Sequence, residues 1–374
     1  MINKVIVAMD SFKGSVSSLE AGLSVKKGIE KVKPSSDVEV LKVSDGGEGL
    51  VEALIHDQND LVQVKVFDPL QRKIVATYGV VNETAIMEMA TCCGLTLIDL
   101  SQRNPYYTTT YGLGQMIKDA LNRGIRKFII GIGGSATNDG GVGMLQALGY
   151  HFLNKDHKEI KQGGLYLQDI DFIDDQDALP ILKECEFNIA CDVKNPLCHE
   201  NGASFIFGSQ KGASMEQIKV LDASLQHYAL KTKHYNHTDY MDYPGTGAAG
   251  GLGFAFLSYL PSKLVSGIDL VLDFIDFDTK IKGADLIITG EGKMDQQSLM
   301  NKTPIGITSR AKKQGIRVIA LTGNYGEDVY ELNEAGVDGV FSILPSVMTL
   351  QEAMDKKQTQ KNIELVVSQL FSVL

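Results

Sequence analysis

Near-continuous apolar runs alternate with stretches of helical spacing at both ends of the chain. The apolar runs cover residues 4–9, 38–43, 285–289, 317–321 and 339–344. Such runs are typical of strands that a parallel sheet buries on both faces. Residues 18–32, and the stretch from 351 to the end, instead repeat apolar positions at helical spacing. The two ends of the chain therefore predict one parallel-sheet domain.

The middle of the chain has a different texture. Residues 61–67, 72–81 and 84–89 alternate apolar and polar positions at close spacing, which predicts antiparallel hairpins. A helix is predicted over residues 113–123, and strands over 126–130 and 187–191. We therefore predict an α/β fold with two α/β domains. A Rossmann-like or flavodoxin-like domain takes residues 1–62 plus 284–374, and a second α/β domain, residues 63–283, is inserted into it.

Charge and cysteine usage narrow the class of protein. The net charge of −10 over 374 residues argues against nucleic acid and anionic membranes as partners. An anionic substrate would then need a local basic pocket. The five cysteines form no Cys-x-x-Cys pair, and no signal-peptide core or membrane-spanning apolar run is found. We expect a reduced, cytoplasmic protein.

The most informative motif follows the predicted strand 126–130. Residues 131–144 read GIGGSATNDGGVGM and contain six glycines. Glycines let a ligand approach main-chain N–H groups, and such groups at a helix N-terminus bind anions. The run matches neither the P-loop nor the dinucleotide fingerprint. Taken alone, it is equally consistent with a phosphate site and with a tight turn that binds nothing.

Acidic, glycine-containing loops follow three of the predicted strands. They are DSFKGS (10–15), SDGGEG (44–49) and GEGKMD (290–295). Carboxylates of this kind suit Mg²⁺, which takes one or two of them together with phosphate oxygens and water. One such loop would indicate an ordinary turn, because Asp and Gly are common turn residues. Three in succession favour a site for phosphate and metal.

Three further segments carry candidate groups. Asp192 comes just after the predicted strand 187–191, and Lys211 lies between glycines in FGSQKG. Lys302 precedes Pro304 at a predicted helix start, where it either reaches a phosphate or faces solvent. Residues 245–253, GTGAAGGLG, form a second Gly-rich segment that either binds a ligand or allows close helix packing.

Taken together, the motifs resemble those of a known family. They are, in order, DSFKGS, SDGGEG, NPYYTTTYGLG, GIGGSATNDGGVGM, CDVKNPL with NGAS and FGSQKG, GTGAAGGLG, and TGEGKMDQQS. This series is similar to the bacterial glycerate kinase family from Asp10 to Gly323. The resemblance implies phosphorylation of D-glycerate by ATP, with Mg²⁺, in a cleft between two α/β domains. It also implies 2-phosphoglycerate as the product.

Phosphoryl transfer needs positioning, charge neutralisation and a base for the hydroxyl group, and the candidate residues are assigned accordingly. The ATP and phosphate set is Gly133, Gly134, Ser135, Ala136, Thr137, Asn138 and Lys302. The catalytic set is Asp192 as the hydroxyl base, with Lys13 and Asp45. The substrate-binding set is Asp10, Ser15 and Lys211, and the Mg²⁺ ligands are Asp45, Asp192 and Glu291. Roles within the acidic set are interchangeable.

Two other functions stay open at this point. One is a glycerate kinase that phosphorylates the 3-hydroxyl group. The other is a non-enzymatic regulator that binds a metabolite in the same cleft, although several carboxylates beside phosphate-type loops argue against it. The expected partners are D-glycerate and ATP, and a homodimer is left open.

Overall fold

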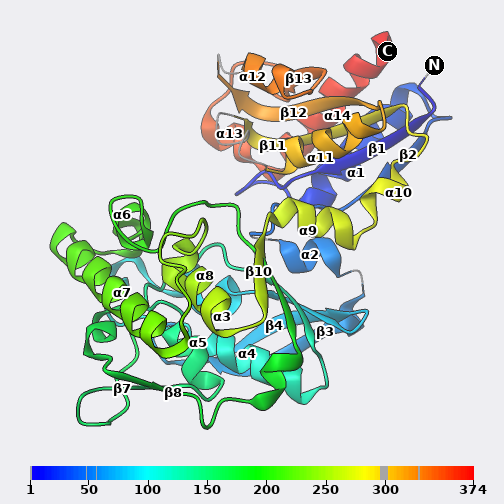
Figure 1. Ribbon diagram of the computed structural model, residues 1–374. Helices are drawn as coiled ribbons and strands as arrows, with labels where there is room; N and C mark the ends of the chain where they lie inside the picture. The colour runs from blue at the N-terminus through cyan, green and yellow to red at the C-terminus, as the bar shows by residue number, and fades with distance from the viewer. Residues whose placement is uncertain (1, 48, 56, 295–301, 327–328) are drawn as a thin grey trace. The chain divides into compact units, whose positions relative to one another are not determined.

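The chain folds into two compact units. The computed structural model describes residues 2–47, 49–55, 57–294, 302–326 and 329–374, so Glu48 of SDGGEG and Asp295 of GEGKMD lie outside the described residues. The first unit comprises Met1–Asp45, Glu52–Leu54 and Ser266–Leu374, and the second comprises Gly46–Val51 and Ile55–Val265 (Figure 1). Both chain ends thus build one unit, as expected. The boundaries differ from 62/63 and 283/284, because residues 46–51 and 55–62 join the second unit and residues 266–283 join the first.

The first unit is built on a five-stranded, wholly parallel sheet. Its strands are β1 (Lys4–Met9), β2 (Asp37–Val40), β11 (Leu286–Met294), β12 (Arg317–Tyr325) and β13 (Gly339–Ser342). Their spatial order is β13-β12-β11-β1-β2. Counted along the chain within this unit, that is the 2-1-3-4-5 order of flavodoxin-like folds, whose topological switch point lies between the first and third strands. Here the switch point lies between β1 and β11.

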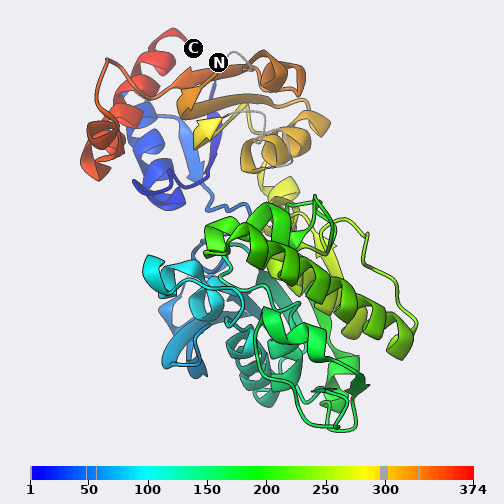
Figure 2. The ribbon, with the colours of Figure 1, turned by 90° about the vertical axis from the view of Figure 1, so that its left-hand side faces the viewer.

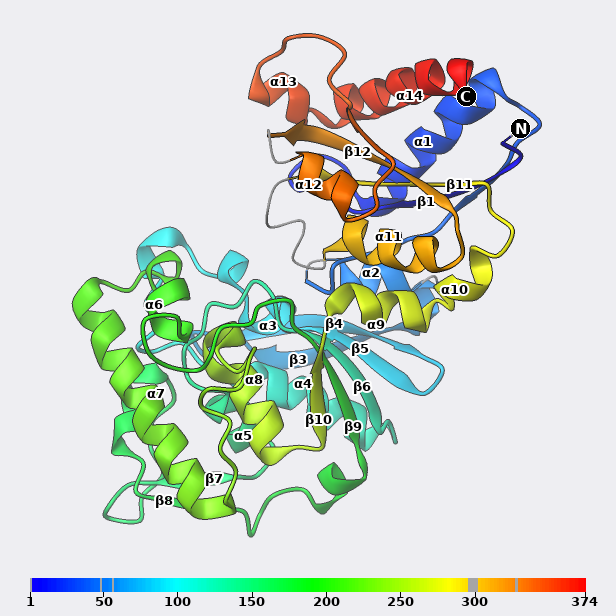
Figure 3. The same ribbon diagram turned by 45° about the horizontal axis from the view of Figure 1, so that its top comes forward.

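Helices cover both faces of this sheet. They are α1 (Ser18–Val32), α9 (Gly267–Phe274), α10 (Phe277–Lys280), α11 (Thr303–Lys313), α12 (Val329–Glu334), α13 (Leu350–Met354) and α14 (Lys356–Val373). Figure 3 shows α1 and α14 on one face and α11 and α12 on the other. Two clusters of buried apolar side chains fill the spaces between these layers. The single terminal helix predicted from residue 351 is in fact two, because Asp355 caps α14 by accepting a hydrogen bond from the Gln358 N–H at 2.9 Å.

The second unit has a mixed six-stranded sheet. Its strands are β3 (Leu61–Phe67), β4 (Lys73–Val81), β5 (Thr84–Glu88), β6 (Lys127–Gly131), β9 (Glu186–Ala190) and β10 (Ser262–Val265). The order is β10-β9-β6-β5-β4-β3. The antiparallel hairpins predicted for residues 61–89 are confirmed, because β3 pairs with β4 and β4 with β5 in that sense. The remaining pairs are parallel, so β5, β6, β9 and β10 bring their carboxyl ends to one edge.

One apolar core joins this sheet to its helices. The helices are α3 (Ala90–Cys93), α4 (Tyr111–Asn122), α5 (Val142–Ala147), α6 (Ala203–Phe207), α7 (Met215–Asn236) and α8 (Ala248–Tyr259), with the short α2 (Leu50–Leu54) at the boundary of the units. Figure 2 brings the long helix α7 to the front. A capping box starts α7, because Ser214 and Gln217 each accept a hydrogen bond from the other's N–H. No helix among the described residues is long and apolar enough to cross a membrane.

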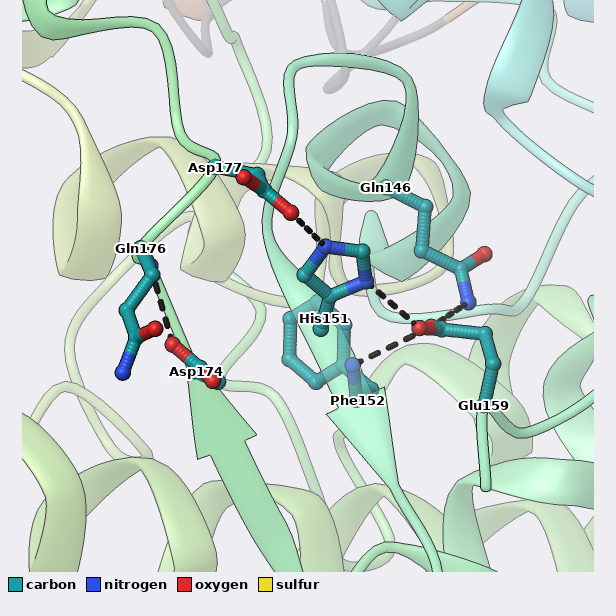
Figure 4. A network of polar contacts seen from close by, with 7 residues as sticks. All are labelled: Gln146, His151, Phe152, Glu159, Asp174, Gln176 and Asp177. Atoms are coloured by element: carbon teal, nitrogen blue, oxygen red, sulfur yellow. Dashed lines mark hydrogen bonds and ion pairs between the residues drawn. The ribbon is translucent and has the colours of Figure 1, made fainter. Parts of the chain in front are cut away.

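A small two-stranded sheet, β7 (His151–Leu153) with β8 (Phe172–Asp174), projects from the second unit. His151 lies between two carboxylates: Nδ1 is 2.8 Å from Glu159 and Nε2 is 3.0 Å from Asp177 (Figure 4). A neutral imidazole donates from only one nitrogen, whereas the imidazolium donates from both. The hydrogen bonds to Glu159 and Asp177 accordingly raise the pKa of His151. This network fastens the hairpin through His151, and protonation of the imidazole strengthens it.

Candidate functional site

In the first unit, candidate residues gather at the switch point of the sheet. Asp10 follows β1 directly, and its N–H donates to the Gly290 carbonyl of β11 at 2.8 Å. Glu291 is the next residue of β11. Open α/β sheets bind ligands outside the carboxyl ends of their strands at such a point. The first unit therefore offers one ligand-binding edge, and Asp10 lies in it.

Asp10 is a buried carboxylate, with 5% of its surface exposed. One oxygen accepts from the Ser11 N–H at 2.6 Å, and the other accepts from the Thr303 hydroxyl at 2.6 Å. Burial raises the pKa of Asp10 to about 6, and the nearby Asp45 carboxylate adds to the rise. The hydrogen bonds from Thr303 and Ser11 act in the opposite direction. Asp10 is thus a fixed acceptor that shares its surroundings with a second acid.

Lys13 brings an exposed ammonium group to the same acids. Its Nζ lies 3.8 Å from Asp45 Oδ2, and 65% of the Lys13 side chain is exposed, against 17% for Asp45. An exposed ion pair of this length contributes little to stability, because water screens it. Lys13 can therefore turn to an anionic ligand at little energetic cost. The structure brings together Asp10, Lys13 and Asp45, all three predicted for the site.

Two other predicted residues of this unit are placed differently. The Ser15 hydroxyl is 2.6 Å from the Thr359 hydroxyl of α14, so Ser15 fastens its loop to a helix and is not aimed at the Asp10 group. Its assignment as a substrate contact stays a prediction. Lys302 is the N-cap of α11, as the Lys-Thr-Pro pattern predicted, and it immediately precedes Thr303. The sequence reasoning missed Thr303, although it begins the predicted helix.

In the second unit, the Gly-rich loop (residues 131–141) leaves β6 at the carboxyl edge of the sheet. Of the residues predicted to hold phosphate, Gly133 and Gly134 are exposed, and Gly134 has a left-handed φ of +71°. Their N–H groups donate to no other residue in the described part of the chain. Ser135 is 7% exposed, and the remaining residues of the set, Ala136, Thr137 and Asn138, are buried. A ligand can therefore meet the loop at Gly133–Gly134.

The helix that follows the loop is already capped by the protein's own carboxylate. Asp139, fully buried, accepts hydrogen bonds from the Gly141 and Gly143 N–H groups, both at 3.2 Å. It also accepts from the N–H and the hydroxyl of Thr110, both at 2.8 Å. Asp139 therefore takes up the N–H groups of Gly141 and Gly143, which leaves Gly133–Gly134 as the part of the loop where the predicted phosphate could bind. The sequence did not reveal this, because Thr110 lies 29 residues away.

Lys211 is also placed differently from the prediction. Only 2% of it is exposed, and its ammonium donates to the Thr137 carbonyl at 2.7 Å. It therefore holds the Gly-rich loop from the inside and does not face a substrate, which corrects its assignment to substrate binding. Burial lowers the pKa of Lys211 to about 7, and the Asp139 charge opposes that shift.

The second Gly-rich segment serves close packing. The Gly140 N–H donates to the Gly250 carbonyl at 3.0 Å, which joins this segment to the Gly-rich loop. A Cβ on Gly250, whose φ is +70°, would stand 2.1 Å from the Thr137 carbonyl oxygen. Only glycine allows both that backbone conformation and that approach. Of the two predicted alternatives for residues 245–253, close packing is confirmed.

Asp192 emerges beside the Gly-rich loop. It lies two residues after β9, and β9 pairs with β6 so that Gly131 stands opposite Ala190. Asp192 is partly buried. The predicted acids thus form two groups: Asp10, Asp45 and Glu291 in the first unit, and Asp192 in the second.

The acidic side chains of the first unit offer Mg²⁺ a small set of carboxylate ligands. Among the described residues, no group of three or more His, Cys, Asp and Glu side chains converges on one point. Mg²⁺ does not require such a cage, because it takes one or two carboxylates, substrate phosphate oxygens and water. Asp45 is close enough to Asp10 to raise the pKa of that acid. This pair of carboxylates fits the protein's share of a magnesium–phosphate site.

Comparisons with known proteins agree with one another. A family model described as "Glycerate kinase family" matches residues 5–374. Glycerate 2-kinase of Escherichia coli is 44% identical over 94% of this chain and 93% of its own. Glycerate kinase of Halalkalibacterium halodurans is 40% identical over 98% of this chain and 99% of its own. The crystal structure of a candidate glycerate kinase 2 from Salmonella typhimurium LT2 superposes with a TM-score of 0.88, at 38% identity, over 100% of this chain and 98% of that one.

Proposed function

Since the chain belongs to the glycerate kinase family, we propose that it transfers the γ-phosphoryl group of ATP to the 2-hydroxyl of D-glycerate, giving ADP and 2-phosphoglycerate. The observation that carries this proposal is the pair of sites: an acidic switch point with an exposed Lys13 in one unit, and a Gly-rich loop beside Asp192 in the other. The relative named glycerate 2-kinase supports the 2-hydroxyl as the acceptor.

We assign glycerate to the switch point of the first unit. Lys13 is exposed and lies 3.8 Å from Asp45, so its ammonium can also pair with the glycerate carboxylate. Asp10 and Asp45 would hold Mg²⁺, which neutralises phosphate charge when it is bound. Lys302 stays a proposed phosphate contact, because it begins α11 next to Thr303, the residue bonded to Asp10. Glu291 stays a proposed ligand of the same metal.

We assign the ATP phosphates to the Gly-rich loop of the second unit. The exposed Gly133 and Gly134 offer main-chain N–H groups without a side chain in the way. Asp192 remains the proposed base, since it leaves the neighbouring strand at the same edge. Its carboxylate would accept the proton of the glycerate hydroxyl as that oxygen attacks phosphorus. The cytoplasm is the proposed compartment, supported by five cysteines that are all unpaired.

The test is a coupled assay for ADP, followed by phosphorus NMR of the product. ATP, Mg²⁺ and D-glycerate together should give ADP, whereas omitting glycerate should give almost none. The product signal should match 2-phosphoglycerate. A signal of 3-phosphoglycerate would reject the proposed regiochemistry. Binding of ATP or glycerate without ADP formation would instead support the metabolite-binding regulator.

A further inference from the structure

Lys211 is the most deeply buried cation of the second unit that the proposed reaction does not use. It belongs to the short 3-10 turn Ser209–Lys211, and its Nζ reaches 74 residues back along the chain to the Thr137 carbonyl, 2.7 Å away. An ammonium group loses its hydration when it is buried, at a cost of several kcal/mol unless partners replace the water. A single neutral carbonyl is a weak replacement. The position therefore calls for a compensating charge or a function.

Asp139 supplies the compensating charge. Burial raises the pKa of Asp139, and its four hydrogen bonds from Thr110, Gly141 and Gly143 act against that rise. Its charge in turn favours the protonated form of Lys211. The Gly-rich loop thus contributes one buried acid, and the turn Ser209–Lys211 contributes a buried lysine that contacts the loop. Without Lys211, an ionised Asp139 would place a negative charge five residues from Gly134, where the proposed phosphates bind.

The contacts of neighbouring side chains also support a holding role for Lys211. The Asn138 amide donates to the Ser204 hydroxyl at 3.0 Å, which fixes one side of the loop. The Thr137 hydroxyl and the Asn138 Oδ1 are buried and have no hydrogen-bond partner among the described residues. Lys211 is therefore the side chain that holds Thr137 in place, through its carbonyl.

We propose that Lys211 is a positioning residue for the nucleotide: its ammonium fixes the Gly-rich loop at the Thr137 carbonyl and neutralises Asp139, so that the loop can accept phosphate. This inference rests on the proposed function, since it assumes that the loop binds ATP. Lys211 itself does not touch the ligand, because it is buried within the second unit.

The charge of Lys211 should respond to pH in the neutral range. Its pKa is lowered to about 7, so the ammonium is present at lower pH and is lost as the pH rises. The charged group that acts on Lys211 is Asp139, which also acts on the Tyr228 phenol of α7, and burial raises the pKa of that phenol. Arg103, whose carbonyl lies against Gly212, donates to the Leu95 carbonyl at 3.3 Å. The KM for ATP should therefore rise with pH.

The experiment compares K211M with the matched control K219M, which removes an exposed lysine from α7. In K211M we expect the KM for ATP to rise by about tenfold or more while the KM for glycerate stays within about twofold. The wild-type KM for ATP should also rise between about pH 6 and about pH 8.5, and K211M should lose that part of the pH dependence. K219M should behave as wild type in both measurements.

A double variant separates charge from packing. D139N/K211M removes both charges, so it should recover part of the ATP affinity that K211M loses. An unchanged KM for ATP in a folded K211M, with an active wild type, would overturn the inference and leave the proposed function intact. An inactive wild type would instead overturn the proposed function. If K211M does not fold, the pH dependence of the wild type decides: a KM for ATP that does not rise with pH in either the wild type or K219M overturns the inference.

Discussion

Thr303 and Asp10 are joined by a hydrogen bond of 2.6 Å between the Thr303 hydroxyl and Asp10 Oδ2, although 293 positions separate them in the chain. The bond ties the first residue of α11 to the residue after β1. It fixes one oxygen of a carboxylate whose other oxygen the Ser11 N–H already holds. The orientation of Asp10 at the switch point therefore depends on Thr303.

Thr303→Val should test that dependence, because valine keeps the shape and removes the donor. We expect the free energy of unfolding to fall by about 1–2 kcal/mol, the cost of leaving a buried acceptor unsatisfied. The KM for glycerate should rise as Asp10 loses its orientation. Urea unfolding and steady-state kinetics measure the two effects. Thr308→Val is the control, since Thr308 is buried on the same helix but donates to the Pro304 carbonyl at 2.7 Å. An equal rise of KM in both variants would contradict the argument.

Lys13→Ala should weaken glycerate binding selectively. Its ion pair with Asp45 is long and exposed, so stability should change by less than about 0.5 kcal/mol. The KM for glycerate should rise by about tenfold or more, because the glycerate carboxylate loses the Lys13 ammonium as its partner. Lys27→Ala, at an exposed position of α1, is the control and should leave the KM unchanged. An unaltered KM in Lys13→Ala would place the glycerate carboxylate elsewhere.

Asp192→Asn should remove the proposed base while keeping its size. We expect the turnover number to fall by a factor on the order of 10² or more, with ATP still bound, because general-base catalysis contributes in that range. Rapid-quench kinetics and calorimetric titration with ATP separate the two quantities. Asp239→Asn is the control, since Asp239 pairs with Lys233 at 2.6 Å on the surface. Near-normal turnover in Asp192→Asn would shift the base to another acid.

Gly250→Ala should disturb the Gly-rich loop through backbone contact. Its Cβ would stand 2.1 Å from the Thr137 oxygen, whereas no described heavy atom lies within 4 Å of a Cβ on Gly283, which has a similar φ of +73°. Gly283→Ala should therefore cost only the left-handed strain, about 1–2 kcal/mol. Gly250→Ala should cost about 3 kcal/mol or more and raise the KM for ATP. Equal losses of stability for Gly250→Ala and Gly283→Ala in thermal unfolding would contradict the argument, because they would show that the Gly-rich loop shifts to admit the Cβ without cost.

His151 should make the β7–β8 hairpin sensitive to pH. The Glu159 and Asp177 carboxylates raise its folded-state pKa, so its stabilising effect is complete below the unfolded pKa of about 6.5. The effect is lost as the pH rises through the folded pKa. The difference in Tm between wild type and His151→Gln should then be larger at about pH 6 than at about pH 9. His234→Gln, at an exposed position of α7, should show no such difference.

The sequence predicted what depends on neighbouring residues. Periodicity was enough for β1, β11 and β12, because each is an apolar run buried on both faces of the sheet. The Asp355 cap that divides the last helix was missed, since an amphipathic pattern continues across it. Cap chemistry is local, so that error was avoidable in principle.

The candidate site was harder, because its polar contacts are long-range. The sequence located the Gly-rich loop and the acids of the switch point. It could not show that Lys211 turns inward to Thr137, nor that Thr110 and Asp139 close the start of α5. Those contacts exist only after separate elements pack. Spacing alone cannot tell a lysine that faces a ligand from one that supports a loop.

The position of β1 in its sheet sets an order of events during synthesis. β1 is an apolar strand whose neighbour β11 comes much later, with Val5 opposite Leu286. At 5–20 residues per second, the ribosome needs roughly 15 to 60 s to make the 281 residues between those two positions. The segment Ile55–Val265 is complete before that and contains every strand of its own sheet. The inserted unit can therefore fold first, while β1 still lacks its neighbour β11.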